Sequence, residues 1–148
     1  MLLIIVAILV IAVDQASKAL IRNFMSVGDS IPLIPGILHI TYVRNPGVAF
    51  GLLPNQKIVF LIISLAVIIF ILYYYRRLNV AERLQTLALG LLLGGTVGNI
   101  IDRFFLGKVT DFIDFRVWPV FNLADSSIVI GIVLLGFVFI NNARKESA

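Results

Sequence analysis

The 148-residue sequence contains no cysteine and only one histidine, His39. Without cysteine, disulfide bonds, thiolate nucleophiles and cysteine-based metal sites are excluded. A single histidine cannot build a metal site alone, and it makes a Ser-His-Asp arrangement a poor expectation. Any chemistry in this chain must therefore rest on carboxylates, amides, hydroxyls and basic side chains.

Charged residues are scarce as well. They make up 14% of the chain, whereas 60% is hydrophobic and the mean hydropathy is +1.05. A small soluble domain could not hide so much apolar surface from water, so a bilayer is the expected solvent. The net charge of +4 is scattered without a basic run, which gives no support to nucleic-acid binding and is typical of contact with anionic lipid headgroups.

Long hydrophobic runs, in contrast, dominate the sequence. Four of them approach the roughly 20 residues that a helix needs to cross the hydrocarbon. They run from Leu2 to Leu20, from Ile58 to Tyr75, from Leu84 to Ile101 and from Phe121 to Ile140. Each run is continuous and does not alternate in polarity, which predicts helices and not barrel strands. We therefore expect an all-α membrane protein with four transmembrane helices in a single domain, residues 1–148.

Four spans place both termini on one side of the membrane. The first run lacks the charged start and the small-residue cleavage site of a signal peptide, so we expect it to remain as a span. The loop between the second and third spans carries Arg76, Arg77 and Arg83, which favours a cytoplasmic location for this loop and for both termini. Basic residues in or beside the opposite loops weaken this charge bias.

The segment between the first two spans, residues 22–57, is long for a connection in a helical bundle. Its stretch from Ile37 to Val43 is rich in β-branched and aromatic residues and follows two prolines and a glycine. This composition predicts a small extracytoplasmic β-sheet or hairpin on the membrane surface, with His39 as a surface strand residue. The second outer loop, Asp102 to Pro119, is shorter and holds several of the chain's acids.

Polar residues within the spans are few, because Asp, Lys or Arg at the centre of a span costs roughly 2.5 to 3.5 kcal/mol. Asp14 and Lys18 lie four residues apart on one face of the first span, where an ion pair and a polar-site scaffold are both open interpretations. The third span ends, and the fourth begins, with polar groups at the same membrane surface. The residues that can converge there are Asp14, Lys18, Asn45, Asn99, Arg103, Asp111, Asn122 and Asp125.

The third span also carries glycines at four-residue spacing, at Gly90, Gly94 and Gly98. This spacing places a flat stripe on one helix face and permits a neighbouring helix to approach closely. We expect the stripe to be a packing surface.

Carboxylates are the catalytic groups that remain. Two close carboxylates cannot both ionise comfortably, so the pair holds one proton: the charged member can activate water while the protonated member polarises a carbonyl. That is the chemistry of an aspartic peptidase. Ser126 or Ser127 with Lys18 leaves a remote Ser-Lys alternative. Composition alone leaves open which two of Asp102, Asp111, Asp114 and Asp125 form the pair.

Five motifs occur in order along the four spans. They are Asp14-Gln15-Ala16-Ser17-Lys18, Asn45-Pro46-Gly47-Val48-Ala49-Phe50-Gly51, Gly94-Gly95-Thr96-Val97-Gly98-Asn99-Ile100-Ile101-Asp102-Arg103, Val109-Thr110-Asp111-Phe112 and Phe121-Asn122-Leu123-Ala124-Asp125-Ser126. With these motifs the sequence resembles the lipoprotein signal peptidase family, also called signal peptidase II. The resemblance covers essentially the whole chain.

This resemblance implies a membrane aspartic endopeptidase whose catalytic dyad is Asp111 and Asp125. The residues that it implies as supporting ones, which hold the dyad or contact the substrate, are Asp14, Lys18, Asn45, Asn99, Asp102, Arg103 and Asn122. For Asp102, structural pairing with Arg103 or with the loop backbone is an equally open interpretation. Asp114 lies outside the family motif, and we interpret it as a solvated loop carboxylate.

The implied substrate is a bacterial prolipoprotein that carries diacylglycerol on its lipobox cysteine and is cut immediately before that cysteine. The implied location is the bacterial cell (inner) membrane, with membrane lipid around the helices and the site near the extracytoplasmic face. We expect no metal, no cofactor and no nucleic-acid partner, and we expect the chain to act as a monomer.

Two other classes of protein compete with this interpretation. Intramembrane Asp and Lys also mark the ion paths of small transporters and proton-conducting subunits, although here the polar residues gather at one surface. A non-catalytic assembly or scaffold protein would explain the glycine stripe but leave the acids without a role. Flux through proteoliposomes would reveal a transporter, and an Asp111 variant that keeps the cellular phenotype would favour a scaffold.

Overall fold

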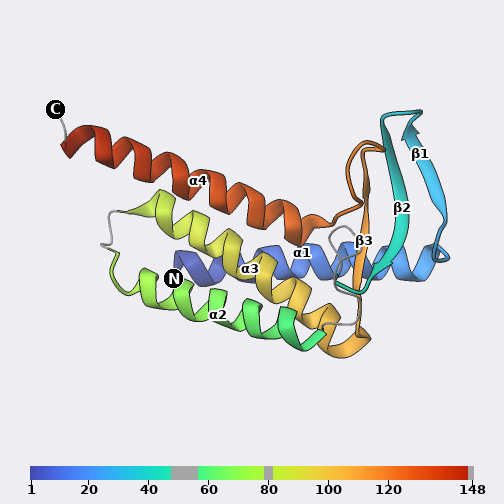
Figure 1. Ribbon diagram of the computed structural model, residues 1–148, viewed down its shortest axis with the longest axis horizontal. Coiled ribbons are helices and arrows are strands. Elements are labelled where there is room, and N and C mark those ends of the chain that lie inside the picture. The colour runs from blue at the N-terminus through green and yellow to red at the C-terminus, as the bar shows by residue number, and fades with distance from the viewer. Residues whose placement is uncertain (48–56, 79–81, 147–148) are drawn as a thin grey trace.

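The computed structural model of the chain describes residues 1–47, 57–78 and 82–146. Its elements are α1 (Leu2–Phe24), β1 (Ser30–Ile34), β2 (Leu38–Asn45), α2 (Lys57–Tyr75), α3 (Arg83–Leu106), β3 (Val109–Asp114) and α4 (Leu123–Glu146). The helices lie side by side with the small sheet at one end of the bundle, and both chain termini lie at the other end (Figure 1). Val48 to Gly51 of the second motif fall outside the described residues.

The prediction of four transmembrane helices is confirmed. All four helices are long and apolar enough to cross a membrane. Three of them continue beyond the apolar runs, α1 to Phe24, α3 to Leu106 and α4 to Glu146. The helix α3 ends at Gly107, whose left-handed conformation (φ 74°) closes the helix and turns the chain into β3.

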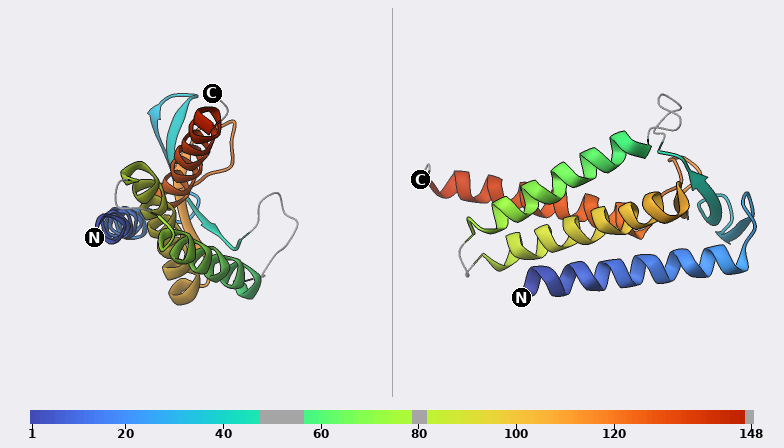
Figure 2. Two further views of the ribbon diagram at one scale, coloured as in Figure 1. Left: turned by 90° about the vertical axis from the view of Figure 1, so that its left-hand side faces the viewer. Right: turned by 90° about the horizontal axis from the view of Figure 1, so that it is seen from below.

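The helix α3 is the centre of the bundle. In its most apolar window 61% of the residues are buried, against 11 to 17% in the other three helices. Viewed from two further directions, α3 lies between α1 and α2 and also packs along α4 (Figure 2). Large apolar side chains on the outer helices, such as Ile8, Ile62 and Val133, point outward and remain exposed. The bundle therefore presents lipid with an apolar exterior and keeps its polar groups near α3.

The glycine stripe of α3 packs against α1, as the sequence predicts. A Cβ on Gly94 would lie 2.6 Å from Val10 Cβ and 2.8 Å from the carbonyl oxygen of Ala7. On Gly98 it would lie 2.6 Å from a carboxylate oxygen of Asp14. Each position requires glycine because a neighbouring helix occupies the space that a side chain would need.

The predicted sheet is present, but it has three strands and not the two of a hairpin. The strands run in the order β1-β2-β3, and both pairings are antiparallel. The third strand comes from the second outer loop, which the sequence did not predict as a strand. Its pairing aligns Asp111 with Val43 and Val109 with Asn45. One dyad candidate is therefore held in a sheet, while the other lies on a helix.

The interpretation of Asp114 as a solvated loop carboxylate is wrong. Asp114 is the last residue of β3 and is only 4% exposed. Its carboxylate accepts hydrogen bonds from Thr41 Oγ1 (2.7 Å) and from the backbone N–H of Arg116 (2.8 Å). The bond from Thr41 is the main cause that lowers the pKa of Asp114 below its ordinary value. Pairing of β3 with β2 buries Asp114, and its hydrogen bonds hold the end of β3 to Thr41 of β2.

Candidate active site

Polar residues from β2, β3 and the sheet-facing ends of α1, α3 and α4 form one hydrogen-bonded cluster. Asn122 links the two aspartates of the proposed dyad. Its side-chain N–H donates to Asp111 Oδ1 at 2.6 Å, and its side-chain oxygen accepts from the backbone N–H of Asp125 at 2.9 Å. Asn122 is fully buried. A single amide therefore fixes the middle of β3 against the start of α4.

Asp111 is 1% exposed, and both of its carboxylate oxygens accept amide hydrogen bonds. Asn45 donates to Oδ2 at 2.8 Å and Asn122 donates to Oδ1. Burial raises the pKa of Asp111 to about 6, the negative charge of Asp125 raises it further, and the two amides oppose the rise. The result is a carboxyl group that changes charge near neutral pH.

Asp125 belongs to the first turn of α4 and completes a capping box with Asn122. The Asn122 side chain accepts from the Asp125 backbone N–H, while Asp125 Oδ2 lies 3.3 Å from the backbone nitrogen of Asn122. The other oxygen, Oδ1, accepts from the Asn99 amide at 2.7 Å. The hydrogen bonds between Asn122 and Asp125 thus both start the helix α4 and orient the Asp125 carboxylate.

The three asparagines around the carboxylates all have their amide oxygen occupied by a donor. Lys18 Nζ donates to the oxygen of Asn99 at 3.0 Å. The backbone N–H of Gly47 donates to that of Asn45 at 2.9 Å, and the Asp125 N–H occupies that of Asn122. The oxygen and the NH₂ group of an amide point in different directions. With its oxygen bound to a donor, each asparagine therefore directs its NH₂ group to a carboxylate.

The ion pair, one of the two interpretations left open for the first span, is present and completely buried. Lys18 Nζ lies 2.9 Å from Asp14 Oδ2, and both side chains have 0% exposure. The second Asp14 oxygen accepts from the backbone N–H of Ala124 at 3.0 Å. Asp14 therefore satisfies an N–H that the first turn of α4 would otherwise leave unpaired. The charge pair on α1 also positions the helix that carries Asp125.

Asp102 pairs with the strand backbone, one of the two structural possibilities left open by the sequence. Its Oδ2 accepts from the backbone N–H of Thr110 at 2.8 Å, next to Asp111 in the chain. Arg22 Nη1 lies 3.4 Å from Asp102 Oδ1 and donates to Thr110 Oγ1 at 3.2 Å. Sequence reasoning missed Arg22 as part of this cluster. The spacing of Asp14, Lys18 and Arg22, four residues each, was the signal that could have found it.

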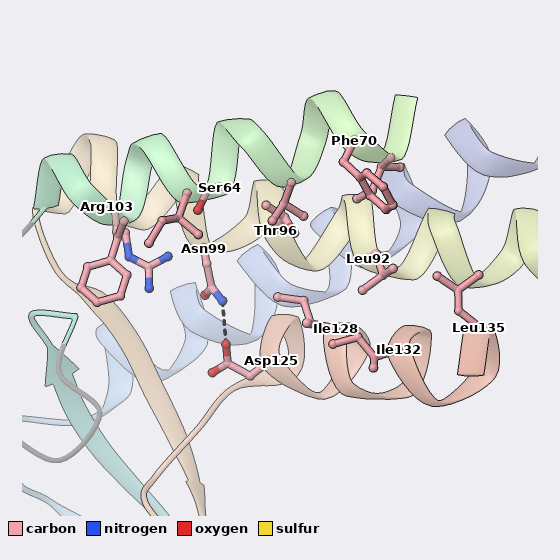
Figure 3. Close-up of a pocket in the computed structure, with 14 residues that line it drawn as sticks. Ser64, Phe70, Leu92, Thr96, Asn99, Arg103, Asp125, Ile128, Ile132 and Leu135 are labelled. Atoms are coloured by element: carbon pink, nitrogen blue, oxygen red, sulfur yellow. Dashed lines mark hydrogen bonds between the residues drawn. The ribbon is translucent and has the colours of Figure 1, made fainter. Parts of the chain in front are cut away.

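An apolar groove of about 470 Å³ leads away from Asp125 between α2, α3 and α4. Asn99, Arg103 and Asp125 lie at its polar end, and apolar side chains such as Leu92 and Leu135 continue it along the bundle (Figure 3). The Arg103 guanidinium lies 5.1 Å from the ring centre of Phe60 on α2. The apolar part of the groove thus leads directly to the carboxylate cluster.

Two neighbouring carboxyl groups that share a proton can activate water and polarise a carbonyl, and this cluster joins two carboxyl groups through one amide. Among the residues that the structure describes, no group of three acidic or histidine side chains is placed to hold a metal ion. The groups available for catalysis are a buried acid, Asp111, a half-buried acid, Asp125, their neutral amide donors and the guanidinium of Arg103.

Comparison with solved structures defines the class of the protein. Two solved bacterial membrane enzymes share its fold. One has a TM-score of 0.87 and 36% sequence identity, with 95% of this chain and 88% of that chain covered. The other has a TM-score of 0.83 and 37% identity, with 93% and 91% covered. The chain therefore has the fold of an integral membrane enzyme.

Sequence comparison gives the family. The family model described as Signal peptidase (SPase) II matches residues 6–141. A lipoprotein signal peptidase of Halothermothrix orenii is 50% identical over 131 residues, which cover 88% of this chain and 90% of that protein. One of Pelotomaculum thermopropionicum is 44% identical over 147 residues, covering 99% and 97%. The chain belongs to the signal peptidase II family of proteases, which leaves the transporter and scaffold interpretations without support.

Proposed function

We propose that the protein removes signal peptides from prolipoproteins that carry diacylglycerol on the lipobox cysteine, cutting the bond before that cysteine. The single observation that carries this proposal is that Asn122 bridges Asp111 to Asp125, which lies at the polar end of an apolar groove. The names of its relatives support the substrate class.

The two aspartates act as a dyad that shares one proton. The charged member takes a proton from water, which attacks the carbonyl carbon before the lipidated cysteine. The protonated member donates to the carbonyl oxygen as the tetrahedral gem-diol forms. Collapse of the gem-diol breaks the C–N bond, and the amine of the cysteine leaves with a proton returned by the dyad. The hydroxyl group of the water ends in the new carboxyl group and its other proton on the amine. The dyad therefore again holds one proton.

The supporting residues have three roles: they contact the carboxylates, hold the elements that carry them, or face the substrate. Asn45, Asn99 and Asn122 donate amide N–H groups to the carboxylates and keep their geometry. The residues that hold the strand and helix carrying the dyad are Asp14, Lys18 and Asp102. Arg103 contributes a cation beside Asp125 in the groove wall, where it is placed to contact the substrate.

The groove receives the apolar part of the substrate. Apart from Ser64 and Thr96, its lining beyond Arg103 is apolar along α2, α3 and α4. A lipid-modified peptide in the bilayer has no need to enter water to reach it. Substrate recognition then depends on lipid as well as on peptide. We place the site near the extracytoplasmic face, with both termini in the cytoplasm, from the arginines of the opposite end.

The experiment is cleavage of a diacylglyceryl-modified prolipoprotein by detergent-purified protein, beside the same substrate without lipid. We expect wild-type protein to cut only the lipidated form and Arg103→Gln to cut it more slowly. Intact folding of each sample is checked by circular dichroism. Absence of cleavage by folded wild-type protein, or equal cleavage of the unlipidated substrate, would contradict the proposed substrate.

A further inference from the structure

A second cavity, of about 380 Å³, lies at the end of the bundle opposite the sheet. Its wall comes from the ends of α2, α3 and α4 and from the residues beside them. The side chains that line it are Tyr74, Arg77, Leu78, Glu82, Gln85, Phe139, Asn142 and Ala143. The cavity is as polar as it is apolar, unlike the groove that leads from Asp125. The dyad and its supporting residues do not contribute to it.

Two opposite charges line this cavity without pairing with each other. Glu82 occupies the N-cap position of α3 but makes no capping hydrogen bond with its side chain. Within the described part of the chain, no cation lies within ion-pair distance of the Glu82 carboxylate. Arg77 is held by Tyr73, whose hydroxyl accepts one N–H at 2.9 Å and whose ring lies 5.0 Å from the guanidinium. No other described residue accepts a hydrogen bond from the Arg77 side chain, which has four further N–H donors.

Gln85 gives the cavity a buried polar wall. Its side chain is only 6% exposed, yet it forms no hydrogen bond with any described residue. Since no described residue occupies this amide, it can form hydrogen bonds with a ligand that enters the cavity. It faces a cavity that already carries one cation and one anion.

Aromatic rings lie between the cavity and the apolar groove. Tyr74 stacks on Phe70, a lining residue of the groove, with ring centres 6.1 Å apart, and Phe139 lies 6.1 Å from Tyr74 on the other side. A ligand in the cavity thus meets polar groups at the membrane surface and aromatic rings toward the membrane interior, as a lipid headgroup would.

We propose that this cavity binds the headgroup of an ethanolamine phospholipid. The phosphodiester accepts hydrogen bonds from Arg77 and from the Gln85 amide, and the ammonium group pairs with Glu82. A zwitterion satisfies both charges, whereas a headgroup with only negative charge would meet the Glu82 carboxylate. Because the lining joins the ends of three helices, the bound lipid fastens α2 to α3 and α4.

The test uses native mass spectrometry of the full-length protein with added phosphatidylethanolamine or phosphatidylglycerol. We expect wild-type protein to bind phosphatidylethanolamine preferentially, and Gln85→Leu and Glu82→Gln each to weaken this binding by about tenfold or more. Arg83→Gln is the matched control, because Arg83 is an exposed neighbour that does not line the cavity and its binding should equal the wild type. Circular dichroism verifies the fold of each variant.

Equal binding of the two lipids by the wild type, or unchanged phosphatidylethanolamine binding by both cavity variants, would overturn the proposal. Soluble glycerophosphoethanolamine is added in a separate arm. If it displaces the lipid at similar concentration, the site binds a soluble phosphoester and the assignment to membrane lipid is wrong. Retention of the lipid against this competitor supports the membrane source.

Discussion

Neutral amides, and not cations, make the closest contacts to the two aspartates. Asn45 and Asn122 donate to Asp111, and Asn99 donates to Asp125. A neutral donor stabilises a carboxylate without cancelling its charge, so the pair remains able to exchange a proton with water. Lys18 acts one step away, through the oxygen of Asn99.

The pH dependence of cleavage follows from Asp111, whose pKa burial raises to about 6. As the pH rises through this value, Asp111 loses the proton that the dyad shares, both carboxylates become charged, and the cleavage rate should decline. Asn45→Ala removes a hydrogen bond that favours the charged form of Asp111, so the midpoint of this alkaline limb should move upward by roughly one pH unit. Rates of lipidated-substrate cleavage between pH 4 and 9 measure this shift.

Thr41→Val is the matched control for Asn45→Ala. Thr41 lies in the same strand, but its hydroxyl donates to Asp114 and not to the dyad. The alkaline limb of Thr41→Val should coincide with that of the wild type. An Asn45→Ala profile that also coincides with the wild type would show that Asp111 does not govern this limb.

From residues alone, four acids remained candidates for the pair, and only the family motifs selected Asp111 and Asp125. Asp114 shows why. Its burial depends on Thr41, 73 positions earlier in the chain, and no local pattern reveals that contact. Arg22 was predictable in principle, because it continues the spacing of Asp14 and Lys18 along one face of α1.

At the scale of elements, periodicity and composition predict the helices far better than the sheet. Continuous apolar runs define the spans, and the β-branched segment around Leu38–Asn45 predicts β2. The strand β3 was missed because aspartate is depleted in strands, and Val109–Asp114 contains two of them. Pairing with β2 and hydrogen bonding of both acids offset that low propensity.

Helix packing gives a prediction with a control within the chain. Gly94→Ala places a methyl group against Val10 and the Ala7 carbonyl, and should lower the free energy of unfolding by about 1 to 3 kcal/mol. Gly136→Ala on α4 meets nothing within 4 Å, and should raise it by roughly 0.5 to 1 kcal/mol through helix propensity. Unfolding of both variants in one detergent measures the difference.

If Gly94→Ala proved as stable as Gly136→Ala, close contact between α1 and α3 would not be the reason for glycine at this position. A loss confined to Gly94→Ala would show that the stripe sets the distance between α1 and α3. That distance matters for the site, because the next glycine of the stripe, Gly98, faces the Asp14 carboxylate.

At the scale of the whole molecule, the bundle separates two environments. The sheet-facing end gathers the buried carboxylates, and the opposite end carries both termini and the arginines around residues 76–83. Between them the groove runs through apolar walls. Hydropathy predicts this separation from sequence, since polar residues occur only near certain span ends. The depth and direction of the groove depend on how α2 and α4 diverge across α3, which no single segment encodes.

The central claim is that Asp111 and Asp125 work as one catalytic unit, and a double-mutant cycle tests it most directly. Asp111→Asn, Asp125→Asn and the double variant are compared with the wild type by the rate of cleavage of lipidated prolipoprotein. We predict that each single change lowers the rate at least about a thousandfold and that the double change lowers it no further. Near-wild-type cleavage by either single variant, or losses that multiply in the double variant, would contradict a shared dyad.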